Sequence, residues 1–293
     1  MTLEQLRIFV AVAERQHLTR AAEALALTPS AVSASIRTLE ERYGTPLFDR
    51  VGRRIEVNAA GRIFLDEARA TLSRAAAAER TLAELAGLQR GTLALQASQT
   101  IASYWLPPLL VRFRATYPQL EIRLDVGNTQ TVAAAVHEGA ADLGLIEGSV
   151  VDAALETEEV GRDSMAVVVA PAHPWTRRRR LAMADLQAAQ WIMREPGSGT
   201  RSVFEAELAR LGADVAALHV ALTLPTNEAV RAAVMTGRYA AGLSELVAAP
   251  YIAGGLLARA PIALPPRGFF LLRHRERYRS SAAQAFGELL RAL

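Results

Sequence analysis

Residues 19–43 read TRAAEALALTPSAVSASIRTLEERY, and this stretch decides the fold of the first part of the chain. It predicts two short helices separated by a turn, with the second helix opening at Pro29. Thr28 can cap that helix with its hydroxyl, and Pro29 fits the first helical position, where its missing N–H costs nothing. The stretch therefore has the form of a helix-turn-helix, whose second helix can enter the major groove of DNA.

The second helix has an apolar face and a polar face. Val32, Ile36, Leu39 and Tyr43 recur at helical spacing, so we expect them to pack inward. The polar face and the end of the turn are expected to meet DNA. The residues predicted to contact DNA from the two helices are Thr19, Arg20, Thr28, Pro29, Ser30, Ser33, Ala34 and Arg37. An ordinary helical hairpin is the alternative.

The flanking residues complete a small domain. Thr2 and Gln5 have the spacing of a capping box and open a preceding helix. Gly44 ends the second helix, and residues 49–57 predict a hairpin that turns at Gly52. Its tip carries three arginines that can hold phosphates or enter a minor groove as a wing, namely Arg50, Arg53 and Arg54. A solvated charged turn is the alternative.

Many positions of residues 1–61 fit one pattern at fixed spacing. They are Leu6, Phe9, Val12, Leu18, Thr19, Ala21, Ala22, Leu25, Pro29, Ser30, Ala31, Val32, Ser33, Ile36, Leu39, Glu40, Gly44, Leu47, Phe48, Arg50, Ala60 and Gly61. Through them the segment resembles the N-terminal domain of LysR-type transcriptional regulators. The resemblance implies sequence-specific binding of double-stranded promoter DNA, a homodimer that assembles into a homotetramer, and contact with RNA polymerase.

From Asn58 to about Leu88 the chain is rich in alanine and free of proline, which predicts one long helix. Such a helix needs a partner along its apolar stripe. The resemblance implies a linker helix that dimerises with an antiparallel copy; packing on the chain's own C-terminal part is the alternative. Gly87 and the pair Arg90-Gly91 are expected to form the hinge that follows.

Residues 91–293 alternate between strand and helix patterns, which favours parallel-rich sheets covered by helices on both faces. Two crossings, near Gly161 and near Pro265-Pro266, divide this part into two α/β lobes. This arrangement resembles periplasmic binding proteins, and LysR-type effector domains share it. The predicted domains are a winged helix-turn-helix domain, rich in α-helix, at 1–58, a linker helix at 59–89 and an effector domain at 90–293, with lobe I at 90–161 and 266–293 and lobe II at 162–265.

A ligand of such a domain is expected between the lobes, where strand ends and helix starts meet. Helix starts offer free N–H groups to anions, so we expect a small anionic effector, such as a carboxylate, a phosphate ester or a sulfur oxyanion. The predicted effector-binding residues are Ser98, Gln99, Thr100, Thr129, Glu195, Gly197, Ser198, Gly199, Thr200, Arg201, Thr226 and Asn227. Helix capping is the alternative role of each serine and threonine.

Composition argues against several other classes of protein. All 33 cationic side chains are arginine, and the net charge of +3 is too small to indicate nucleic acid by itself. The chain has no cysteine, and its five histidines lack the spacing of metal ligands, so no metal, cofactor or enzymatic activity is expected. The run Arg177–Arg180 is expected to be a solvated loop.

The N-terminus does not resemble a secretory signal, and no apolar run is long enough to span a bilayer. The sequence therefore predicts a cytoplasmic transcription regulator of the LysR type without a membrane partner, whose DNA binding is modulated by an effector in the cleft between the lobes. The alternatives are a small-molecule solute-binding protein without a DNA role and an enzyme with a two-lobed cleft.

Overall fold

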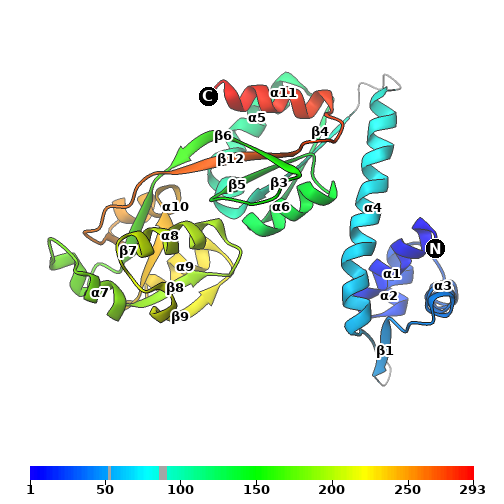
Figure 1. Ribbon diagram of the computed structural model, residues 1–293, viewed down its shortest axis with the longest axis horizontal. Coiled ribbons are helices and arrows are strands. Elements are labelled where there is room, and N and C mark those ends of the chain that lie inside the picture. The colour runs from blue at the N-terminus through cyan, green and yellow to red at the C-terminus, as the bar shows by residue number, and fades with distance from the viewer. Residues whose placement is uncertain (52–53, 86–90) are drawn as a thin grey trace. The chain divides into compact units, whose positions relative to one another are not determined.

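The computed structural model describes residues 1–51, 54–85 and 91–293 (Figure 1). The chain forms two compact units, one centred on residues 1–82 and the other on the residues that follow. Among the residues that the structure describes, no helix combines the length and the apolar character needed to cross a lipid bilayer.

The first unit begins with three helices, α1 (Leu3–Arg15), α2 (Leu18–Ala24) and α3 (Pro29–Tyr43). Thr2 caps α1 in the predicted capping box. The Thr28 hydroxyl caps α3 and accepts a hydrogen bond from the backbone N–H of Ala31 at 3.2 Å. The helix-turn-helix is confirmed, with its start set by the cap that the sequence predicts.

The inner face of α3 packs as its spacing predicts, except at its last residue. Val32, Ile36 and Leu39 are buried among residues of α1 and α2. The prediction that Tyr43 packs inward is wrong, because its side chain is 56% exposed. Tyr43 lies in the final turn, beyond the buried cluster, and the Arg42 guanidinium lies 5.7 Å from its ring centroid.

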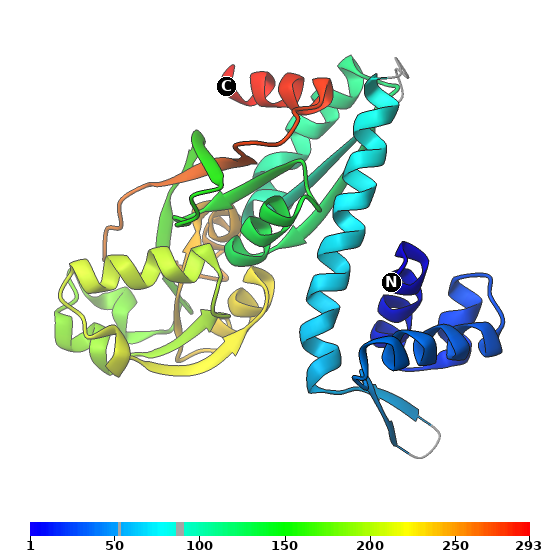
Figure 2. The same cartoon turned by 45° about the vertical axis from the view of Figure 1, so that its right-hand side comes forward.

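A hairpin and a long helix complete this unit (Figure 2). Strands β1 (Phe48–Val51) and β2 (Arg54–Val57) are antiparallel, and the turn expected at Gly52 lies outside the described residues. Helix α4 (Ala59–Leu85) starts where the Asn58 side chain accepts a hydrogen bond from Gly61 N at 2.8 Å. Of the expected hinge, Gly87 and Arg90 also lie outside the described residues.

The second unit contains the two predicted lobes. The sheet of lobe I has the order β4-β3-β5-β12-β6. Its strands are β3 (Thr92–Ser98), β4 (Glu121–Gly127), β5 (Leu143–Glu147), β6 (Leu155–Asp163) and β12 (Arg267–His274). Strand β3 pairs in parallel with β4 and β5, whereas β12 pairs antiparallel with β5 and β6. The sheet is therefore mixed, because β12, the strand that returns from lobe II, runs against the other four.

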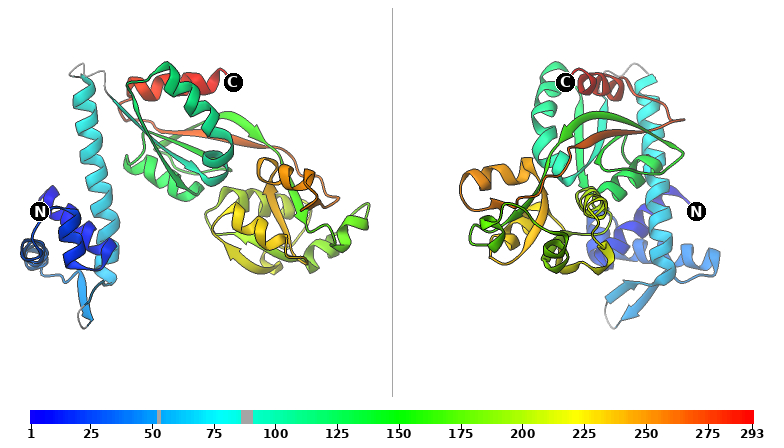
Figure 3. Two further views of the ribbon diagram at one scale, coloured as in Figure 1. Left: turned by 180° about the vertical axis from the view of Figure 1, so that it is seen from behind. Right: turned by 60° about the vertical axis from the view of Figure 1, so that its left-hand side comes forward.

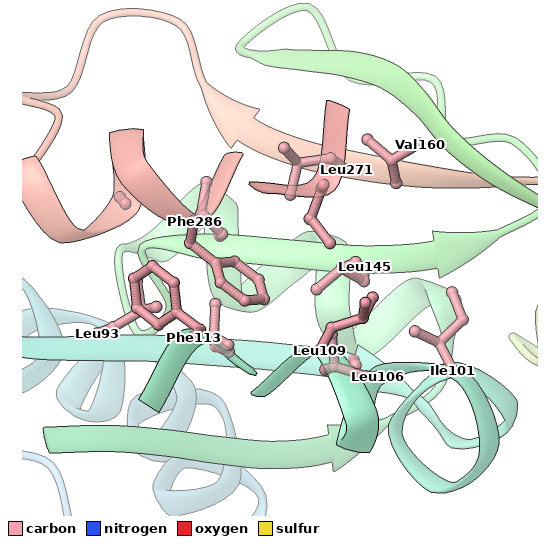
Figure 4. Close-up of a cluster of buried hydrophobic side chains, with 14 of the residues drawn as sticks. Leu93, Ile101, Leu106, Leu109, Phe113, Leu145, Val160, Leu271 and Phe286 are labelled. Atoms are coloured by element: carbon pink, nitrogen blue, oxygen red, sulfur yellow. The ribbon is translucent and has the colours of Figure 1, made fainter. Parts of the chain in front are cut away.

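Helices cover both faces of the lobe I sheet. They are the short π-helix η1 (Ile101–Trp105), α5 (Leu106–Thr116), α6 (Thr129–Glu138) and α11 (Ser281–Arg291). Figure 4 shows Phe113 of α5 and Phe286 of α11 in one cluster, with ring centroids 5.0 Å apart. Residues of α6 pack in a second cluster on the opposite face.

Lobe II repeats this layered plan with the strand order β11-β7-β10-β8-β9. Its strands are β7 (Met165–Val169), β8 (Gln190–Arg194), β9 (His219–Leu224), β10 (Ala240–Ser244) and β11 (Ala258–Arg259). The helices are α7 (Met183–Ala188), α8 (Gly199–Arg210), α9 (Asn227–Val234) and α10 (Glu245–Ala253), with short 3₁₀ turns η2 (Pro174–Arg177) and η3 (Val215–Ala217). Two apolar clusters, one on each face of the sheet, join it to these helices.

The chain crosses between the lobes twice (Figure 3). Strand β6 ends in lobe I at Asp163, and β7 starts in lobe II at Met165, so the first crossing falls at Ser164. The second lies between β11 and β12. Because two connections tie the lobes together, side chains from both can be held at one cleft.

Candidate DNA-binding and effector sites

The polar face of α3 is open to solvent in the first unit. Pro29, Ser30, Ala34 and Arg37 are exposed, and Ser33 is half-buried. The side chains along this face up to Ala34 are short, so the helix backbone can come close to base edges in a major groove. Arg37 follows one turn later and adds a cation suited to phosphate or guanine.

The remaining DNA-contact candidates lie on α2 and the hairpin. Thr19 and Arg20 are exposed on α2. In the hairpin, the backbone of Arg50 pairs with Ile55 and that of Arg54 pairs with Val51. Arg53 lies outside the described residues. The hairpin backbone therefore places Arg50 and Arg54 in the two strands that lead to its tip.

In the second unit, the predicted effector residues meet directly where lobe I faces lobe II. Lobe I contributes Ser98 at the end of β3, Gln99 and Thr100 directly after it, and Thr129 at the start of α6. Lobe II contributes residues 195–201 before and within α8, and residues 226–227 at the start of α9. The backbone N–H of Gln130 donates across the cleft to the Gly197 carbonyl at 3.3 Å. The two lobes are therefore in contact across the cleft.

Glu147 lies at the centre of this contact, although the sequence did not predict it as a site residue. It is the last residue of β5 and is 2% exposed. Its carboxylate accepts hydrogen bonds from the hydroxyl of Ser98 in lobe I and, at 3.1 Å, from that of Thr200 in lobe II. Its backbone carbonyl accepts from the Thr129 hydroxyl at 2.8 Å. Glu147 thus joins three of the predicted residues, two through its side chain and one through its backbone.

Arg267 supplies the buried cation beside Glu147. It lies at the start of β12, and its guanidinium donates to one oxygen of Asp163 at 2.9 and 2.8 Å. It also donates to the Thr200 hydroxyl at 3.1 Å and lies 3.8 Å from the Glu147 carboxylate. A buried charge needs such partners, because its desolvation is otherwise very costly.

Arg194 forms a second centre at the end of β8. Its guanidinium binds the Glu195 carboxylate through two contacts, at 2.8 and 3.0 Å. It also donates to the side-chain oxygens of Gln99 at 3.2 Å and Asn227 at 3.0 Å. The same Gln99 oxygen accepts from the Asn227 backbone N–H at 2.9 Å. This centre therefore connects the end of β3 to the start of α9.

A third contact joins the π-helix η1 to α9. The Tyr104 hydroxyl donates to the Glu228 carboxylate at 2.6 Å, and Gln99 donates to the same carboxylate. Burial and the adjacent Glu228 raise the pKa of Tyr104. Burial alone would raise the pKa of Glu228, but hydrogen bonds from Tyr104, its own backbone N–H and Gln99 outweigh that effect and lower it.

Two of the predicted hydroxyls cap helices, which was their alternative role. Ser198 caps α8 by accepting from Arg201 N at 3.4 Å, and Thr226 caps α9 by accepting from Ala229 N at 3.1 Å. The Arg201 guanidinium is bound to Glu205 at 2.7 Å and to the Arg194 carbonyl at 3.0 Å. The charge that the sequence suggested for an anion at Arg201 is therefore paired within lobe II.

A small pocket opens beside this network. Its volume is about 280 Å³, and it is lined by Thr129, Gln130, Ala133, Ser149, Val150, Gly197 and Ser202. It combines hydroxyl and amide groups with two apolar side chains and includes the first residue of α6. Within the described ranges, no group of three or more His, Asp and Glu side chains is placed to share a metal ion.

The sequence analysis missed the charged residues of the cleft. Glu147, Arg194 and Arg267 each lie at the end or the start of a strand that borders the cleft. A charged residue directly after a short run of apolar residues was the available signal for Glu147 and Arg194. Arg267 offered no such signal, because its partner Asp163 is 104 residues away.

Comparison with known proteins matches both units. Residues 3–62 match the family model described as bacterial regulatory helix-turn-helix protein, lysR family, and residues 86–293 match the model of the LysR substrate binding domain. The "Uncharacterized HTH-type transcriptional regulator YeiE" of Escherichia coli (strain K12) is 36% identical over 288 residues, which cover 98% of this chain and 96% of that protein.

Solved structures share the fold. The crystal structure of CbnR, a LysR family transcriptional regulator, superposes with a TM-score of 0.75 at 21% identity and covers 100% of this chain and 99% of that one. The regulatory domain of CcmR from Synechocystis PCC6803, in complex with 2-PG, gives a TM-score of 0.62 at 25% identity, covering 69% of this chain and 96% of that one.

Proposed function

Because the chain belongs to the LysR family of bacterial transcriptional regulators, we propose that the polar face of α3 reads promoter DNA and that a small effector acts between the two lobes. The protein has a DNA-binding helix-turn-helix and an effector-binding domain. The observation that carries the assignment of the DNA-reading face is the exposure of the short side chains of Pro29, Ser30 and Ala34, which leaves α3 free to enter a major groove.

The DNA contacts divide into two groups by chemistry. The residues of α2 and α3 proposed to lie in or beside the major groove are Thr19, Arg20, Thr28, Pro29, Ser30, Ser33, Ala34 and Arg37. Arg50, Arg53 and Arg54 of the hairpin hold phosphates or reach into the minor groove, which adds affinity for any sequence.

The effector is a small anion, and the proposed site comprises the residues 98–100, Thr129, Glu195, 197–201 and 226–227. Helix starts and buried arginines support this class of ligand. The complex of the Synechocystis CcmR domain with 2-PG supports a small-molecule ligand for a domain of this fold. The proposed domains are 1–58 for DNA binding, 59–89 for the linker helix and 90–293 for the effector.

The proposed assembly involves α4. Ile63 and Leu82 on this helix are 73% and 68% exposed, and a second copy of the helix would cover such apolar side chains. A homodimer would present two recognition helices to a two-fold related DNA site, and two dimers would form a tetramer. The regulator acts in the cytoplasm, where it meets DNA and RNA polymerase.

The test of the DNA-binding surface replaces Arg53 and Arg54 by alanine and measures fluorescence anisotropy with duplex DNA over a range of salt concentrations. Loss of phosphate contacts should weaken binding to every sequence. It should also reduce the slope of log K against log salt by roughly 2 for each DNA-binding domain that contacts the duplex.

The matched control replaces Arg177 and Arg179, exposed arginines of lobe II, by alanine, with the same change in net charge. This control should keep the wild-type slope. An unchanged slope in the hairpin variant would remove the wing from the contact surface. Wild-type protein that never bound duplex would instead leave only the function of a solute-binding protein.

A further inference from the structure

We propose that Glu147 is a built-in ligand: its carboxylate occupies an anion subsite formed by Ser98, Thr200 and Arg267 and holds the two lobes together. An effector that carries a carboxylate or a similar oxyanion would act by taking its place. This inference rests on the proposed function, because it concerns the same interlobe site, and it identifies the chemistry of one part of that site.

The subsite has the composition that an anion site needs. It offers two hydroxyl donors, Ser98 and Thr200, which are 2% and 0% exposed, and one buried guanidinium, that of Arg267. The donors come from separate parts of the domain: β3, α8 in the opposite lobe, and the strand β12 that connects the lobes. Charge-assisted hydrogen bonds of this kind are stronger than those between neutral groups.

The direction of the hydrogen bonds shows that the subsite is arranged around a negative charge. The single proton of the Thr200 hydroxyl is donated to Glu147, while its oxygen accepts from Arg267. Thr100 lies 3.4 Å from Thr200 and accepts from the Asn227 side chain, so its own proton is free to point toward Thr200. The chain of donors therefore ends at the Glu147 carboxylate.

Glu147 also links the two lobes, as a bound anion at this position would do. Its carboxylate bonds to Ser98 in lobe I and to Thr200 in lobe II, and so bridges the cleft. Gly199 of lobe II packs so closely on this residue that a Cβ there would lie 2.1 Å from the Glu147 carbonyl oxygen. The closed cleft therefore needs no external anion. An effector must compete with a carboxylate that is part of the chain itself.

The experiment is rescue of the Glu147→Ala variant of the full chain with acetate. Removing the carboxylate leaves Ser98, Thr200 and Arg267 around a gap that acetate can fill. The variant should melt below the wild type, and sodium acetate should raise its Tm by roughly 3 °C or more at saturation. Isothermal titration should give at least about tenfold tighter acetate binding to the variant than to the wild type.

The controls separate charge, shape and position. Acetamide has nearly the shape of acetate without its charge, and sodium chloride matches its ionic strength; neither should raise the Tm of the variant. Glu205→Ala removes a carboxylate that pairs with Arg201 elsewhere on α8, and acetate should not rescue it. Equal effects of acetate and acetamide, or no effect of acetate on Glu147→Ala, would overturn the proposal.

A second variant tests the proposal in case Glu147→Ala does not fold. Glu147→Gln keeps the volume but removes the charge, so its Tm should fall further than that of Glu205→Gln; stability equal to the wild type would overturn the proposal. Duplex binding is measured on the same samples. If acetate fails while the wild type still binds DNA, only the built-in ligand is refuted, whereas a wild type without DNA binding refutes the proposed function.

Discussion

At the scale of single residues, the cleft is held together by charged side chains that each have a buried partner. Arg267 and Asp163 have side chains that are only 3% and 1% exposed and share two hydrogen bonds. Such a pair adds little net stability compared with apolar residues, but loss of one partner is costly because it leaves an unpaired buried charge. These residues therefore restrict the cleft to arrangements in which every charge stays paired.

The contact between Tyr104 and Glu228 makes a prediction about pH. Tyr104→Phe removes the hydroxyl that donates to Glu228 and should lower the free energy of unfolding by about 1 kcal/mol at pH 7, a value reduced for the partial exposure of the pair. Because the folded state lowers the pKa of Glu228, its contribution is present above the ordinary value of 4.5 and is lost as the pH falls through the folded pKa.

Denaturant unfolding of the wild type and Tyr104→Phe between pH 3 and pH 8 measures this difference. The gap between the two proteins should be largest near neutral pH and should shrink below about pH 4.5. Tyr104 itself stays protonated over this range, because its pKa is raised above 10.0. A gap that is constant across the whole range would show that the hydroxyl does not act through Glu228.

At the scale of secondary structure, three helix starts meet at the cleft between the lobes. Helices α8 and α9 begin at capping residues Ser198 and Thr226, whose side chains already satisfy backbone N–H groups. Helix α6 is capped as well, since the Asn128 side-chain oxygen accepts from Thr131 N at 3.0 Å, and the pocket opens beside Thr129 and Gln130. Gly197 and Ser202 line the same pocket, so the starts of α6 and α8 both border it.

The close contact between α8 and β5 makes a second prediction. A methyl group at Gly199 would meet the Glu147 carbonyl oxygen at 2.1 Å, so Gly199→Ala must move the two lobes apart. We expect a loss of about 1–3 kcal/mol in the free energy of unfolding of the effector domain, as for other overpacked sites.

The matched control is Gly91→Ala, whose new methyl group would meet only Leu120 Cδ2 at an ordinary 3.5 Å. Urea unfolding followed by tryptophan fluorescence compares the two variants, because all three tryptophans lie in the effector domain. A Gly199→Ala protein as stable as the control would mean that the lobes separate easily.

At the scale of the whole molecule, the two units carry separate parts of the function. The first unit holds the helix-turn-helix, and the second is the effector-binding domain and is built on cores of its own. A regulator needs both units. The effector can change DNA binding only if it binds one conformation of the protein more tightly than another.

Paired recognition helices make a prediction about DNA geometry. If a dimer binds two half-sites about one helical turn apart, inserting half a turn of DNA between them should turn one half-site away from its recognition helix. Affinity should then fall by roughly 100-fold, because the second contact is no longer intramolecular. Anisotropy titrations with operators that differ only in this spacing measure the effect. Equal affinity for both operators would argue that each DNA-binding domain binds on its own.

The sequence alone was sufficient for the fold of both units, because the patterns that define it are local. The cap at Thr28, the proline at the first position of α3 and the alternation of strand and helix in the second unit are set by residues a few positions apart. Tyr43 shows the limit of such patterns, since helical spacing places it on the apolar face but the neighbouring helices do not reach it.

Only the tertiary structure decided how the cleft is filled. Tyr104 and Glu228 are 124 residues apart in the chain, and Asp163 and Arg267 are 104 apart, so no local pattern connects them. The sequence identified hydroxyls and glycines that suit an anion but not the chain's own carboxylate, Glu147, that binds them. The physical reason is that helix and strand formation depend on spacing along the chain, whereas the pairing of buried charges depends on which segments the completed fold brings together.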